Sequence, residues 1–176
     1  MSDSDTPSTL PPPGLFDRLV IGMNALGSIW ILFLVLLVTS DAMGRSLFAS
    51  PIVGVTELIQ ISIIGIVFLQ LADAIRTHRM TRADSFLTLL KMWRPRLSSA
   101  VEGSFFLIGA IYMALGLWGS IPLLIEAYER NEVIGNTGLF TLIIWPIKAI
   151  IGLGLAVSLI ELLRQSYGAW VRALRG

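Results

Sequence analysis

The sequence predicts an all-α membrane protein with four transmembrane helices, both termini in the cytoplasm and an interfacial amphipathic helix between the second and third spans. Three observations support this prediction. Four long apolar stretches fill most of the 176 residues, basic residues gather on one side of those stretches, and one connecting segment repeats apolar residues at helical spacing. The composition agrees, since 55% of the residues are hydrophobic and 14% are charged, against about 25% charged in a typical soluble domain.

Each apolar stretch has the length of a transmembrane helix. A helix rises about 1.5 Å per residue, so a stretch of roughly 20 residues matches the hydrocarbon core of a bilayer, which is about 30 Å thick. Lipid offers no hydrogen bonds to the backbone, and a helix satisfies its own. Residues 1–14 are polar, acidic and proline-rich, and we expect a disordered tail there, followed by a four-helix transmembrane domain over residues 15–176. The predicted spans are Leu19–Thr39, Ile52–Ala72, Gly103–Ile125 and Gly138–Ile160.

The distribution of basic residues predicts the orientation. Ten lie before the first span, between the second and third spans or after the fourth, whereas only Arg45 and Arg130 lie in the other two loops. Basic residues are enriched in cytoplasmic loops, so both termini and the middle loop are expected in the cytoplasm. The ten are Arg18, Arg76, Arg79, Arg82, Lys91, Arg94, Arg96, Arg164, Arg172 and Arg175.

The middle loop contains a candidate interfacial helix over residues 83–94. Its apolar residues, which include Phe86, Leu89 and Trp93, recur at steps of three and four, with Asp84 on the opposite face. A basic, tryptophan-bearing amphipathic helix is typical of a segment that lies on the membrane surface. An ordinary soluble connector with one apolar face is the alternative.

Several classes of protein do not fit this sequence. There are no cysteines for disulfides or iron–sulfur clusters, and the single histidine, His78, cannot supply two axial imidazoles to a haem. The net charge of +1 does not indicate a nucleic-acid partner. None of the common catalytic or nucleotide-binding motifs occurs. We therefore expect no catalytic residues, no cofactor and no metal site.

Two charged residues, Glu57 and Lys148, lie inside the apolar stretches. Intramembrane charges are costly and usually have a partner or a function. The two could form a proton or ion relay, or they could clamp helices together, within the chain or between subunits, and we favour the clamp with Lys148 as the first candidate partner of Glu57. Gln60 lies one turn from Glu57.

A second polar pair, Gln70 and Asp73, repeats the Glu57–Gln60 spacing near the other end of the second span. Polar stripes of this kind form hydrogen bonds across helices and indicate faces that meet protein. At the end of the first span, Asp41 and Arg45 lie four residues apart. They are neighbours on one face if the helix continues through Arg45. We also predict that Arg45 holds a group of the loop before the second span.

The stretch from Asp41 to Leu87 resembles the small, DctQ-type membrane subunit of tripartite ATP-independent periplasmic (TRAP) transporters. A weaker match is Trp145–Pro146 followed by a glycine-rich apolar run. The positions that carry the denser match are Asp41, Arg45, Phe48, Pro51, Gly54, Glu57–Leu58, Ala72, His78 and Asp84.

This resemblance implies a role and a set of partners. In such transporters a soluble periplasmic protein captures an organic anion, often a carboxylate, and a large permease subunit carries it together with sodium in an elevator-like movement. The small subunit stabilises the permease in the bacterial inner membrane, in contact with lipid. The alternatives are an autonomous, homo-oligomeric transporter or channel that uses Glu57, and a membrane anchor for a redox enzyme, which the lone His78 disfavours.

Overall fold

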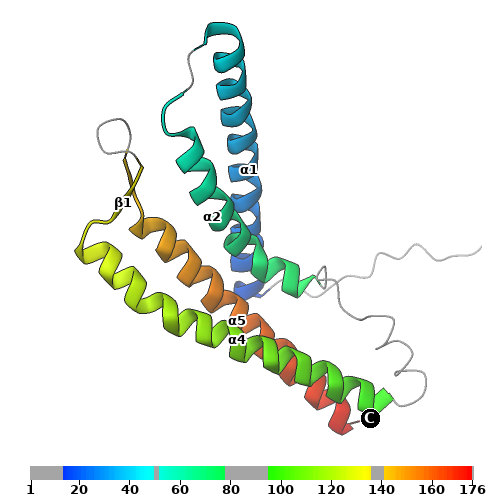
Figure 1. Ribbon diagram of the computed structural model, residues 1–176. Helices are drawn as coiled ribbons and strands as arrows, with labels where there is room; N and C mark the ends of the chain where they lie inside the picture. The colour runs from blue at the N-terminus through cyan, green and yellow to red at the C-terminus, as the bar shows by residue number, and fades with distance from the viewer. Residues whose placement is uncertain (1–13, 50–51, 78–94, 136–140, 176) are drawn as a thin grey trace, which may run out of the picture.

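Four long helices dominate the part of the chain that the computed structural model describes, residues 14–49, 52–77, 95–135 and 141–175. A two-stranded antiparallel hairpin, β1 (Val133–Ile134) and β2 (Leu142–Ile143), separates the last two helices (Figure 1). The helices are α1 (Leu15–Phe48), α2 (Val55–Arg76), α4 (Pro95–Glu129) and α5 (Trp145–Arg175).

All four helices are long and apolar enough to cross a membrane. Most of them also extend well beyond the apolar stretches. α1 has 34 residues and is therefore about 51 Å long, compared with a hydrocarbon core of about 30 Å. Backbone hydrogen bonding continues into the polar residues at the membrane surface, so charged residues such as Asp17 and Asp41 belong to α1 although they lie outside its apolar stretch.

The start of the last helix differs from the predicted span, which began at Gly138. Leu142 and Ile143 pair with Ile134 and Val133 in the β-hairpin, and α5 begins at Trp145. Short apolar runs have the same hydropathy in a strand and in a helix, so hydropathy alone does not separate them. Pro146 lies in the first turn of α5, where its missing N–H removes no intrahelical hydrogen bond.

The helices form two hairpins that meet through α2 and α5. α4 packs along α5, and α2 contacts α1 on one side and α5 on the other. Figure 1 shows that the α1–α2 and α4–α5 hairpins diverge from this contact toward their loops. We call the region where α1 begins, α2 ends and α5 crosses them the junction, and the opposite end of α1 and α2 the loop end.

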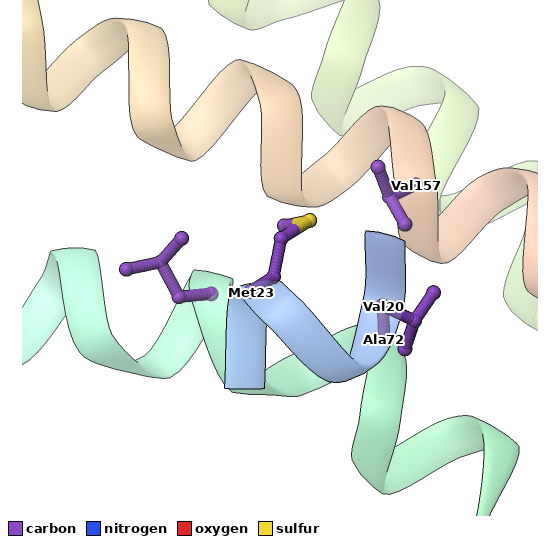
Figure 2. Packing of buried hydrophobic residues seen from close by; sticks show 5 residues of the cluster. Val20, Met23, Ala72 and Val157 are labelled. Atoms are coloured by element: carbon purple, nitrogen blue, oxygen red, sulfur yellow. The ribbon is translucent and has the colours of Figure 1, made fainter. Parts of the chain in front are cut away.

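Small residues and close packing hold the junction together. Val20 and Met23 of α1, Ala72 of α2 and Val157 of α5 form a buried cluster (Figure 2). Gly154 of α5 lies so close to α2 that an added Cβ would stand 2.4 Å from the carbonyl oxygen of Phe68. Lipid tails are as apolar as the side chains, so helix association in a membrane depends on such tight contacts rather than on the removal of water.

Candidate functional site

Asp41 joins the loop end of α1 to the start of α2. Its carboxylate accepts a hydrogen bond from Arg45 Nη2 at 2.8 Å and another from the backbone N–H of Ile52 at 2.8 Å. α1 continues through Arg45, as the four-residue spacing required. Within the described residues, which omit positions 50 and 51 of the following loop, Arg45 contacts Asp41 and no group of that loop, so its predicted contact there stays a prediction. The buried Asp41 contacts the loop through Ile52, while the Arg45 side chain is 63% exposed.

A ladder of hydrogen bonds ties α1 to α2 from the junction outward. Asn24 donates to Asp73 at 2.9 Å, and Trp30 donates from Nε1 to the Ser62 hydroxyl at 3.1 Å. Between these two contacts Gln70 reaches the Ser28 hydroxyl at 3.5 Å. The polar pair Gln70 and Asp73 therefore lies on a face of α2 that meets another helix of the same chain.

Ion pairs extend this contact to α5 at the junction. Arg76 Nη2 lies 3.0 Å from Asp73, and Arg164 of α5 donates to Asp17 of α1 at 2.8 Å. The Arg76 guanidinium also lies 4.0 Å from Asp17. These charges thus connect α1, α2 and α5. Of these residues, only Asp73 was predicted as an interface residue, because it forms a polar pair with Gln70 at the end of the second span. The other charges look like ordinary surface charges in the sequence.

Glu161 of α5 is a buried carboxylate that was not predicted as a site residue. It lies one residue beyond the predicted end of the fourth span, yet it is only 3% exposed because α5 continues to Arg175 and crosses the other helices there. Gln165 donates through Nε2 to Glu161 Oε1 at 2.9 Å and to the carbonyl oxygen of Ile75 at 3.0 Å. A Glu–Gln spacing of four residues on one helix face was the available signal.

The other polar pair of α2, Glu57 and Gln60, has a different environment. Glu57 lies in the first turn of α2, where the positive end of the helix dipole favours a carboxylate. It is half-buried, and Gln60 is exposed. Within the described residues, neither side chain forms a hydrogen bond or an ion pair.

Lys148 is not the partner of Glu57. Its Nζ lies 2.6 Å from Glu132 Oε2 and donates to the carbonyl oxygen of Leu123 at 3.2 Å. Because α5 begins at Trp145, Lys148 lies in the first turn of this helix rather than deep within a span. The β-hairpin brings Glu132 within its reach, so Lys148 clamps α5 to the end of α4.

The loop-end halves of α1 and α2 leave an apolar groove between them. Its volume is about 410 Å³, and its walls include Leu34 and Val38 of α1 and Ile63 and Val67 of α2. The groove lies beyond the Trp30–Ser62 hydrogen bond, on the Asp41 side of the ladder. It is an open apolar surface between two helices, on which a partner could pack.

Four predicted residues, Pro51, His78, Asp84 and Trp93, lie outside the described residues, together with the predicted interfacial helix. Among the residues that are described, no three His, Cys, Asp or Glu side chains gather where they could hold a metal ion.

Comparison with known proteins identifies the family. The family model described as "Tripartite ATP-independent periplasmic transporters, DctQ component" matches residues 34–172. No curated protein and no solved structure matches the chain. The matched range covers α2, α4, the β-hairpin and most of α1 and α5, and four apolar helices agree with a multi-pass membrane protein. The chain belongs to the DctQ family, the small membrane components of TRAP transporters.

Proposed function

We propose that this chain is the non-transporting scaffold subunit of a sodium-coupled TRAP transporter that imports an organic anion, such as a carboxylate, into the cell. Its partners are a large permease subunit in the bacterial inner membrane and a periplasmic substrate-binding protein. The observation that carries the proposal is that charged residues of this chain form ion pairs with one another. Lys148 and the junction charges pair with one another across helices of the same chain, where they stabilise the fold.

The orientation follows from the basic residues. Ten basic residues lie on the side of the two termini and the middle loop, whereas two lie in the other loops. This difference favours a cytoplasmic location for the junction and both termini. The Asp41 contact and the β-hairpin then face the periplasm. Reporter fusions after Gly176 and within residues 126–137 should report cytoplasm and periplasm, respectively. Both reporters on one side of the membrane would contradict this orientation.

The polar and apolar groups beside the groove support one docking face for the permease. Thr56, Gln60, Ile63 and Val67 are exposed and follow one another at steps of four, three and four residues along α2, so they form a stripe. Ile63 and Val67 belong to the groove wall. Gln60 lies five residues into α2, or about 7 Å along the helix.

The chemistry of this stripe favours a protein partner over lipid. A glutamine amide has two donors and an acceptor, none of which a hydrocarbon chain can satisfy. Glu57, one turn away, adds a carboxylate. A transmembrane helix of the permease that carries hydrogen-bond donors would satisfy these groups and fill the groove with its apolar side chains.

Crosslinking tests this docking face. A photoreactive benzophenone amino acid at Ile63, in the groove, should crosslink to the permease when the two subunits are expressed together. The same residue at Leu115 of α4, which is 67% exposed, is the matched control and should crosslink to lipid or not at all. Strong crosslinks to the permease from Leu115 and none from Ile63 would move the interface to α4.

An autonomous transporter is the competing function, and the half-buried Glu57 without a described partner is the observation in its favour. The two functions separate in liposomes. The scaffold hypothesis predicts uptake only when the permease and the binding protein are present with this chain. Uptake by the purified chain alone would establish the competitor.

A further inference from the structure

Three polar atoms on one face of α5 are buried without a hydrogen-bond partner among the described residues. They are Ser158 Oγ, Glu161 Oε2 and Gln165 Oε1. The three residues follow at steps of three and four, so they share one side of the helix. Ser158 is 0% exposed and Glu161 is 3% exposed. Native proteins rarely leave buried acceptors unpaired, and each such atom calls for an explanation.

The hydrogen bonds around these atoms fix which groups lack a partner. The Gln165 amide nitrogen already donates to two acceptors, Glu161 Oε1 and the carbonyl oxygen of Ile75. A flipped amide would place its oxygen against both acceptors, so the orientation is determined. Glu161 Oε2 lies 3.7 Å from Arg164 Nη1, beyond hydrogen-bond distance, while the same nitrogen donates to Asp17 at 2.8 Å. Two acceptors therefore remain that need a donor or a cation.

Among the described residues, the linked charges at the junction do not balance. The ion pairs join three carboxylates, those of Asp17, Asp73 and Glu161, to two guanidiniums, those of Arg76 and Arg164. The linked group carries one excess negative charge. The most buried of the three carboxylates is Glu161, the one with the free oxygen. An uncompensated charge in such a place is costly.

We propose that Glu161, Gln165 and Ser158 bind one alkali-metal cation between α5 and α2. Hard cations take oxygen ligands, and this face offers a carboxylate oxygen, an amide oxygen and a hydroxyl. A site with one carboxylate and otherwise neutral oxygen ligands balances the charge of a monovalent cation rather than that of a divalent one. The bound ion satisfies the free acceptors and neutralises the junction, and it thereby fixes the contact between the two hairpins. This site belongs to the chain itself and does not depend on the proposed partners.

Thermal unfolding of the purified full-length chain in detergent tests the site. The midpoint is measured in sodium, potassium and N-methyl-D-glucamine chloride at one pH and one ionic strength, so that the screening of the ion pairs is equal. When the concentration of the alkali cation is about ten times its dissociation constant, binding of one ion should raise the midpoint by about 3–5 °C above the value in N-methyl-D-glucamine chloride. The increase should saturate with the concentration of the alkali cation.

Variants assign the effect to these residues. Glu161→Gln should abolish the difference between the salts. Ser158→Ala removes a hydroxyl that makes no hydrogen bond in the structure, so the fold should persist while the half-saturating cation concentration rises several-fold. Glu126→Gln, in an exposed ion pair with Arg130, is the control and should keep the full effect.

Three outcomes would contradict the proposal. Equal midpoints for the wild type in all three salts would show that no alkali cation binds. A midpoint that ignores the cation but rises as the pH falls, and loses that rise in Glu161→Gln, would show that a proton on Glu161 supplies the missing charge. A Ser158→Ala variant with a wild-type cation response would remove Ser158 from the site and would contradict the proposed set of ligands.

Discussion

Arg164 of α5 donates a hydrogen bond to Asp17 of α1 at 2.8 Å, across 147 residues of sequence. This contact ties the first turn of the first helix to the last helix. The Asp17 side chain is 18% exposed and Arg164 is 56% exposed, so the pair is partly screened by solvent.

The Asp17–Arg164 pair should make a small, salt-dependent contribution to stability. Asp17→Asn should lower the free energy of unfolding by about 1 kcal/mol or less, because one partner is exposed. The loss should shrink when the salt concentration rises, since salt screens the attraction. Chemical unfolding of the purified chain at low and high salt measures both effects. Glu126→Gln, in a pair with both partners exposed, should change less, and an equal or larger loss there would contradict this assignment.

Gly154 and Gly152 should respond differently to the same substitution. An added Cβ at Gly154 would lie 2.4 Å from a backbone oxygen of α2, which cannot move aside, whereas Gly152 has nothing within 4 Å of the added atom. Gly154→Ala should therefore destabilise the chain by about 3 kcal/mol. Gly152→Ala should be neutral or slightly stabilising, because alanine favours a helix. Thermal unfolding of the two variants checks this, and equal midpoints would show that α2 and α5 are not in close contact.

Asp41 should matter more than Arg45 for the α1–α2 loop. Asp41→Ala removes the acceptor of the Ile52 N–H and also frees Arg45, whereas Arg45→Ala leaves the Asp41–Ile52 contact in place. We expect faster proteolysis of the loop and a lower yield of assembled transporter from Asp41→Ala. Arg45→Lys should be nearly silent, because the exposed guanidinium contacts Asp41 alone among the described residues. A larger effect from Arg45→Lys than from Asp41→Ala would reverse this order.

Lys148 should couple to Glu132 and not to Glu57. In a double-mutant cycle, Lys148→Met with Glu132→Gln should show a coupling free energy of about 1 kcal/mol, because the two side chains are in direct contact and only partly exposed. The cycle of Lys148→Met with Glu57→Gln should be additive within about 0.5 kcal/mol. Stability of the purified chain is the measurement. Coupling in the second cycle alone would restore the pairing expected from the sequence.

Glu57→Gln distinguishes a scaffold from a transporter. Glutamine keeps the size and much of the hydrogen bonding of the side chain, so a scaffold should assemble and support uptake near the wild-type rate. Glu57→Leu should weaken assembly with the permease, because its donor on the partner would be left unpaired in the membrane. Co-purification and uptake in liposomes are measured together. Normal assembly of Glu57→Gln with no uptake would assign Glu57 to ion coupling.

The sequence alone determined the membrane class and the four helices. The thickness of the hydrocarbon core sets the length of each apolar stretch. Because lipid offers no hydrogen-bond partners to the backbone, apolar segments of this length cross the membrane as helices. The residues from Asp41 to Leu87 also indicated the DctQ family, which the family comparison confirms. The ends of the helices were harder to predict from the sequence, because helices continue into polar residues. The hydropathy of Leu142–Ile143 also fits a strand as well as a transmembrane helix.

Only the tertiary structure decided which polar residues meet. Glu57 and Lys148 are both charged residues within apolar stretches, but they do not contact each other, since the β-hairpin places Glu132 against Lys148. Glu161 looked like a surface charge because it lies just beyond the predicted end of the fourth span, yet the crossing of α5 and α2 buries it. Hydropathy is a local property of the chain, whereas burial and pairing depend on where distant helices cross.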